Sequence, residues 1–228
     1  MPSAQTSIEA ATDGRLTGPA ALRAHLREGT RAAHEALDAR FSGMTEEAGP
    51  ESYRRFVAMN AAAFADLVPR LLASALAARP EAVAPLVASL AALEADRAAM
   101  DLDALGAPEA SAPASAAPGL DEAVGIAYVL EGSKLGARYM HRRLLQRRAA
   151  ELWPEASFRY LADADASAGF SAYLSVLAGA DPDDLAAPAR QDARLAGAEA
   201  AFRHFGAVLD RIDAGPAPAK GHCHGIAP

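Results

Sequence analysis

The sequence is short of several residue types, and each shortage excludes a class of protein. Its 228 residues include one cysteine, Cys223, so no internal disulfide can form and a reducing compartment is expected. Aromatic residues make up 6% of the chain, whereas 51% is hydrophobic and alanine dominates, a composition that favours helices. No run of β-branched and aromatic residues alternates as a half-buried strand would. The chain is therefore expected to bury its core between helices.

Positive charge and long apolar runs are also scarce. The formal net charge is −7, which argues against nucleic acid as the main partner. No apolar run reaches the roughly 18 residues of a membrane span, and the first residues lack the basic and apolar regions of a secretory signal. We therefore expect a cytoplasmic protein that binds neither nucleic acid nor a membrane.

Apolar residues recur at helical spacing along most of the chain, which predicts an all-α fold in one domain. Residues 1–17 and 214–228 are mostly small and polar and are predicted to be disordered, which leaves a helical domain at 18–213. Residues 106–119 form a Pro/Ala/Ser linker inside this domain. The expected helices cover residues 19–41, 51–76, 79–100, 120–150, 154–162, 166–178 and 183–213.

Two glycines interrupt the helix expected at 120–150, in the stretch YVLEGSKLGARYM. Gly132 and Gly136 are four residues apart and share one helical face, although glycine costs a helix interior about 1 kcal/mol relative to alanine. Two explanations remain open for this face. Either another helix packs closely against it, or a flat ligand lies against the bare backbone.

Six cations begin within this stretch, with no acid between them in a chain that is acidic overall. They are Lys134, Arg138, Arg142, Arg143, Arg147 and Arg148. The first three are spaced by four residues and share a face, on which like charges repel. A solvated surface is one interpretation, and an anionic ligand or an acidic partner protein is the other. A flat ligand with acidic groups fits the glycines and the cations together.

The first predicted helix contains a candidate metal ligand, in the stretch LREGTRAAHEALD. His34 lies beside the apolar stripe, and Asp38 follows it by four residues, where its carboxylate can hold the ring nitrogen that a metal does not use. Arg27 lies two turns before His34 on a nearby face. A histidine at such a position can also be structural, so both interpretations stay open.

The stretches LREGTRAAHEALD and YVLEGSKLGA together resemble the bacterial members of the heme oxygenase family. The first resembles the proximal helix, whose histidine binds the heme iron, and the second resembles the distal helix, whose glycines let it bend over the heme. The resemblance extends over residues 20–213. It implies a helical bundle with heme b, both substrate and cofactor, between these helices. The implied reaction consumes O2 and opens the ring to biliverdin, carbon monoxide and iron.

The resemblance also implies roles for individual residues. His34 is the expected iron ligand, and no other metal is expected. The expected catalytic residues of the distal helix are Gly132, Ser133 and Gly136. The other residues expected to contact heme are Arg27, Asp38, Tyr128, Arg138 and Arg142. Among these the arginines are expected near the propionates, and a purely structural role in the core is the alternative for Tyr128.

Three departures from the family pattern bear on activity. Ser133 stands where many members have aspartate, Ala137 stands where a third glycine is common, and residues 161–189 contain no basic side chain. A non-catalytic heme-binding or heme-trafficking protein of the same fold therefore stays an alternative. A diiron oxidase is disfavoured because the chain has no Glu-x-x-His pair.

The resemblance further implies partners. The expected electron donor is a protein of the ferredoxin, flavodoxin or reductase type, received by the outward-facing Arg143, Arg147 and Arg148. A bilin-binding photoreceptor is a further candidate partner. The sequence GHCHG at 221–225 could bind a metal, but no specific role is expected for it.

Overall fold

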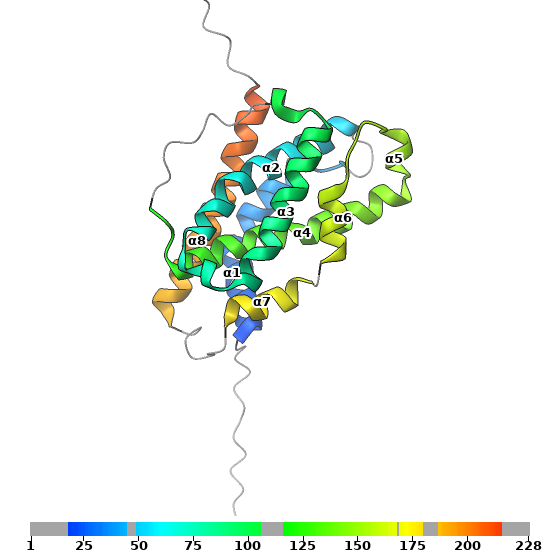
Figure 1. Ribbon diagram of the computed structural model, residues 1–228. Coiled ribbons are helices and arrows are strands. Elements are labelled where there is room, and N and C mark those ends of the chain that lie inside the picture. Colours follow the sequence, from blue (N-terminus) through cyan, green and yellow to red (C-terminus); the bar gives the residue numbers. More distant parts are fainter. Residues whose placement is uncertain (1–17, 45–48, 106–115, 168, 180–186, 216–228) are drawn as a thin grey trace, which may run out of the picture.

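The computed structural model describes residues 18–44, 49–105, 116–167, 169–179 and 187–215, and all regular structure within these ranges is helical (Figure 1). This confirms the predicted all-α fold. The helices are α1 (Gly18–Ala39), α2 (Pro50–Leu72), α3 (Pro80–Ala99), α4 (Leu120–Gln146), α5 (Ala149–Leu152), α6 (Arg159–Ala166), α7 (Phe170–Ala178) and α8 (Pro188–Ala214), with 3-10 turns η1 (Ala75–Ala78) and η2 (Leu102–Leu105). Most of the linker, the first predicted disordered segment (1–17) and residues 216–228 of the second, which contain the GHCHG sequence, fall outside the described residues. Ala214, predicted to be disordered, is the last residue of α8.

Proline marks the beginning of three long helices. Pro50, Pro80 and Pro188 are the first residues of α2, α3 and α8. At this position the missing N–H group has no partner to lose, and the fixed φ angle is already helical. None of the helices that the structure describes is both long enough and apolar enough to span a membrane.

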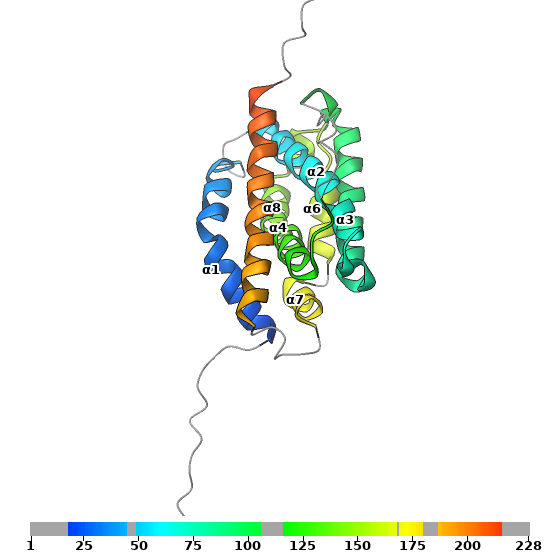
Figure 2. The ribbon, with the colours of Figure 1, turned by 90° about the vertical axis from the view of Figure 1, so that its left-hand side faces the viewer.

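Helix α4 runs through the centre of the bundle, where it packs against α8 on one side and α6 on another (Figure 2). The crossing with α8 is very close. A Cβ atom on Gly125 would lie 1.9 Å from the carbonyl oxygen of Arg194, and one on Gly197 would lie 2.1 Å from that of Glu122. Only glycine permits such an approach, so these two glycines fix where α4 lies against α8.

Helices α2 and α3 pack together and cover α4 and α6, and together these elements enclose the core. The largest fully buried side chains are Tyr53, Tyr160, Phe64, Leu26, Leu67, Leu71, Leu76, Leu86, Leu93, Ile126, Leu130 and Leu161.

Helix α1 lies at the edge, against α8 and α7 (Figure 2). Residues 31–36 of α1 are all exposed. The buried side chains of α1 are Leu22, Leu26 and Thr30, which all precede this exposed part of the helix.

Several predicted helix boundaries differ from the structure by four or five residues, and two of these differences have a clear structural reason. The helix expected at 120–150 ends at Gln146, because Arg148 takes a left-handed conformation with φ of 55° that interrupts the helical path. The helix expected at 154–162 begins only at Arg159. There the buried carboxylate of Asp96 on α3 accepts the backbone N–H groups of Arg159 and Tyr160, each at 2.9 Å. This cap comes from a distant part of the chain, so local sequence could not reveal it.

Candidate functional site

The predicted histidine and its carboxylate partner lie together on α1. Nδ1 of His34 is 3.0 Å from Oδ2 of Asp38, and 60% of the His34 side chain is exposed. The hydrogen bond with Asp38 raises the pKa of His34, and partial burial opposes this rise. Because the neutral ring has one N–H group and donates it from Nδ1 to the carboxylate, Nε2 carries the free lone pair. The pair therefore presents a metal-binding nitrogen on the exposed part of α1.

The side chain of His34 packs against helix α8. The edge of the His34 ring meets Phe202, with ring centroids 5.8 Å apart and planes at 68°. Just beyond the same end of α1, Arg40 forms ion pairs with two residues of α8, with Asp210 at 2.6 Å and with Asp213. These contacts hold the helix that carries His34 in a defined position on α8.

The two glycines of the distal stretch differ from those of the helix crossing. A Cβ atom on Gly136 would meet nothing within 4 Å, and one on Gly132 would make an ordinary contact of 3.7 Å with the Phe170 ring. On Gly125, by contrast, it would collide with backbone. Close helix packing thus accounts for the glycine at 125, whereas the face at 136 borders open space.

Phe170 was not singled out from the sequence, yet its ring lies beside two predicted site residues, Tyr128 and Gly132. Its ring lies 5.4 Å from that of Tyr128, and the guanidinium of Arg23 lies 5.9 Å from its centroid. It is the first residue of α7, and the positive φ of 104° at the preceding Gly169 turns the chain into this helix. Burial raises the pKa of Tyr128, while Arg23 and Arg27 act in the opposite direction. Tyr128 is thus buried against α7 with two cations nearby.

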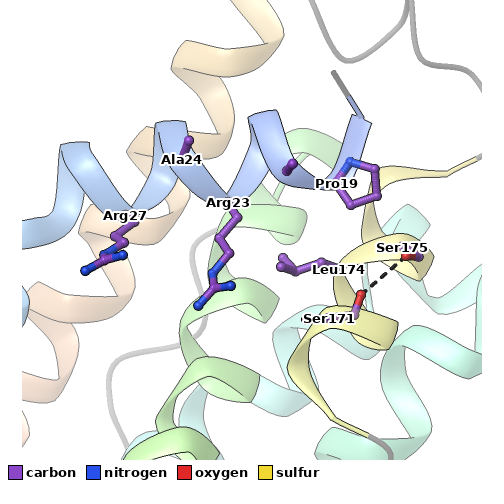
Figure 3. A pocket seen from close by; sticks show the side chains of 8 residues that line it. Pro19, Arg23, Ala24, Arg27, Ser171, Leu174 and Ser175 are labelled. Carbon is purple, nitrogen blue, oxygen red and sulfur yellow. Dashed lines mark hydrogen bonds between the residues drawn. The ribbon is translucent and has the colours of Figure 1, made fainter. Parts of the chain in front are cut away.

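A cavity of about 480 Å³ opens between α1 and α7. Arg23 and Arg27 project into it from the same face of α1, and Ser171 and Ser175 lie across it on α7 (Figure 3). Arg27 was predicted from the sequence, but Arg23 was not. Its spacing of four residues from Arg27 was the signal available. Two exposed guanidinium groups at one opening make this region suited to an anion.

Ser133 points away from the open face and towards α6. Its Oγ atom lies 2.7 Å from the carbonyl oxygen of Leu130 and 2.8 Å from the hydroxyl of Tyr160. A carbonyl oxygen only accepts hydrogen bonds, so Ser133 donates to Leu130 and Tyr160 donates to Ser133. The departure from aspartate at this position is therefore accompanied by a buried tyrosine partner.

The cations that follow the glycines do not form one surface. Lys134 is buried, contrary to its grouping with Arg138 and Arg142 on a solvated face. Arg138 donates to the carbonyl oxygens of Ala164 and Ser167, at 2.5 and 2.9 Å, at the end of α6. Arg142 is largely exposed, with one contact of 3.4 Å to Asp165. The expectation that Arg138 and Arg142 bind propionates stays a prediction.

The fold and this arrangement define a helical protein with an available histidine on an edge helix and an open glycine face on the central helix. Residues 20–211 match the heme oxygenase family, and the chain belongs to this family. Membership indicates binding and degradation of heme, which these proteins take as substrate. No individually curated protein matches the chain.

Proposed function

We propose that the protein is a heme-degrading oxygenase that holds heme between α1 and α4 through His34. It opens the ring to biliverdin, carbon monoxide and iron, with O2 as oxidant and electrons from an external donor. The observation that carries this proposal is the combination of an Asp38-oriented His34 with the open face at Gly136, within a chain of the heme oxygenase family.

The residues present fit heme in three respects. His34 offers Nε2 to the iron, as an axial histidine does in many heme proteins. Gly136 leaves room for a flat ring to lie against the backbone of α4. Arg23 and Arg27 offer guanidinium groups to the propionates at the opening between α1 and α7. Each part of the ligand thus has a matching group in this chain.

The cations best placed for the propionates are those on α1. Tyr128 lies close to Arg23 and Arg27, whereas Arg142 follows Tyr128 by fourteen residues, about 21 Å along a helix. Both propionates leave a heme from one edge, so cations near Tyr128 and a cation at the end of α4 cannot all receive them. We therefore favour Arg27 with Arg23 as propionate partners over Arg142, whose side chain is largely exposed.

Heme supplies the iron that reacts with O2, and the side chains of this chain control its surroundings. Asp38 keeps the proton on Nδ1 of His34 and so keeps Nε2 available. The bare face at Gly136 lets the backbone of α4 restrict the space over the distal side of the ring. This restriction favours oxidation of the ring edge over that of an external substrate.

The end of α4 and helix α5 are suited to the electron donor. Leu145 and Leu152 are 60% and 63% exposed, which is high for leucine. Arg147 and Arg148 are exposed in the same segment. Exposed apolar side chains bordered by basic ones match the apolar centre and charged rim of a transient interface. We propose that an acidic electron-transfer protein docks here.

Substitution of the histidine tests the proposal. His34→Ala should abolish the spectrum of histidine-ligated ferric heme at stoichiometric heme, because it removes the nitrogen proposed to bind the iron. His141→Ala is the matched control, since His141 also lies beside a carboxylate, with Nδ1 3.6 Å from Asp165, and should leave the spectrum unchanged. The opposite pattern would show that His141 is the ligand and would overturn the assignment.

A non-catalytic heme-binding protein is the second candidate, and the observation in its favour is Ser133 in place of aspartate. Both candidates predict the same ferric spectrum. They differ after a reductant is added in air, when only the enzyme consumes the heme and forms biliverdin.

A further inference from the structure

The glycine-bearing stretch of α4 has two faces with opposite properties. On one face a Cβ at Gly136 would meet nothing within 4 Å. On the other, buried and partly buried polar side chains join α4 to α6. These are Glu131, Ser133 and Lys134 of α4 with Tyr160 and Asp163 of α6, which we call the anchor cluster.

Lys134 is the charged centre of the anchor cluster and is almost completely buried. Its Nζ atom lies 3.1 Å from Oε2 of Glu131, 3.8 Å from Oδ2 of Asp163 and 3.4 Å from the carbonyl oxygen of Pro85 on α3. Replacement of such a buried pair by apolar residues is often neutral for stability. The pair instead restrains the position of this turn. Glu131 and Lys134 flank Gly132, and Lys134 joins the turn to α6 through Asp163 and to α3 through Pro85.

Tyr160 supplies the uncharged part of the anchor cluster. It is completely buried, and its ring packs against Phe56 and Phe64 with centroids 6.5 and 6.1 Å away. Burial raises its pKa far above the usual range, so the hydroxyl stays a donor at physiological pH. That hydroxyl donates to Ser133, whose own proton goes to the carbonyl oxygen of Leu130.

The position of Tyr160 is itself fixed from α3. The carboxylate of Asp96 accepts the backbone N–H groups of Arg159 and Tyr160, both at 2.9 Å, and the hydroxyl of Ser157 at 2.5 Å. Asp96 is fully buried. Tyr160 therefore lies at the beginning of α6, which Asp96 holds in place. Its hydroxyl group accordingly has a well-defined position for the hydrogen bond with Ser133.

We propose that the anchor cluster positions the glycine stretch of α4 for ring opening, with Tyr160 and Lys134 as positioning residues. Glycines give a helix more conformational freedom, because they have no side chain that restricts the backbone. The anchor cluster restrains this turn through contacts on the side that faces α6. The opposite face, at Gly136, is therefore held at a constant distance from the heme. This inference rests on the proposed heme site, but the restraint is measurable without heme.

The test is native-state hydrogen exchange of the heme-free protein. Tyr160→Phe removes only the hydroxyl. Exchange of the amides of residues 132–137 should then rise about fivefold, as expected for the loss of one buried hydrogen bond, while amides in α8 change less. Tyr53→Phe is the matched control. Tyr53 is equally buried, but its hydroxyl donates to the carbonyl oxygen of Ser157 instead of to α4, so this variant should not change residues 132–137 selectively.

A second variant tests the charged part independently. Glu131→Gln with Lys134→Met removes both charges and should retain the fold, yet it should produce the same selective rise in exchange. If both this variant and Tyr160→Phe leave residues 132–137 as protected as in the parent, or if the increase is uniform over the chain, the restraint does not exist and the proposal is wrong.

The link to ring opening is read from the products of the heme-loaded protein. Tyr160→Phe should broaden the mixture of biliverdin isomers, and Tyr53→Phe should not. A selective rise in exchange with an unchanged isomer pattern would overturn the positioning role. If the parent protein does not open heme at all, the proposed function fails, and the exchange experiment still decides whether the restraint is present.

Discussion

Gly136→Leu separates the stability of the protein from its capacity for heme. A Cβ at this position meets nothing within 4 Å, so the first side-chain atom of the substituted residue creates no clash in the heme-free protein. Leucine is a better helix former than glycine by roughly 0.8 kcal/mol. For a chain of this size, 1 kcal/mol shifts Tm by about 2–4 °C. The heme-free variant should therefore melt a few degrees higher than the parent.

The heme affinity of Gly136→Leu should fall, although the stability of the heme-free variant rises. A leucine side chain would occupy the space in which the ring is proposed to lie, and a gap of even 0.5–1 Å removes roughly a quarter to half of each contact energy. We expect heme affinity to fall at least tenfold, or about 1.4 kcal/mol, with a smaller fall for Gly136→Ala. Differential scanning calorimetry and a heme titration measure the two effects.

Gly206→Ala on α8 is the control, since a Cβ there also meets nothing within 4 Å. It should raise Tm as Gly136→Ala does and leave heme affinity unchanged. Unchanged affinity and turnover in Gly136→Leu would refute the argument that heme approaches this face. A fall in Tm would show instead that the space beside Gly136 is not open.

Three further predictions concern the crossing, the histidine and the donor surface. Gly125→Ala places a methyl group 1.9 Å from a backbone oxygen of α8 and should lower the free energy of unfolding by about 1–3 kcal/mol or more, measured by urea denaturation. In the heme-free protein, Asp38→Asn should lower the pKa of His34 towards about 6.5, measured by NMR. Arg147→Glu with Arg148→Glu should slow turnover driven by an acidic donor protein and reduce its salt dependence, while turnover with a small uncharged reductant stays the same.

The sign of the histidine effect follows from linkage. Asp38 raises the pKa of His34 in the folded protein, so this contact stabilises the fold fully only below the pKa of the unfolded chain, near 6.5. The stabilisation is lost as pH rises through the higher folded pKa. The stability difference between the parent and Asp38→Asn should therefore shrink at alkaline pH. A difference that grows with pH would contradict the assignment.

Much of the candidate site could be proposed from the sequence because its signals are local. His34 and Asp38 are one helical turn apart, so their contact follows from spacing alone. Gly132 and Gly136 stand out because a chain rich in alanine offers a better helix former. Spacing alone cannot show that α1 and α4 belong to one site. The family resemblance suggested this, and the family match covers both helices.

The missed features depend on contacts between distant segments. Tyr160 meets Ser133 across 27 positions in the chain, and Asp96 caps α6 across 63. A solvated face was one interpretation for Lys134, because the sequence does not show that Glu131 and Asp163 surround its buried charge. A single sequence records the charge of Lys134 but not the packing that removes it from water.

The most direct test of heme degradation is the optical spectrum of the heme-loaded protein before and after a reductant is added in air. We predict that the Soret band of histidine-ligated heme disappears while the absorption of biliverdin grows, and that carbon monoxide is released. A Soret band that persists through repeated reduction and reoxidation would contradict the proposal and would identify a heme-binding protein without turnover.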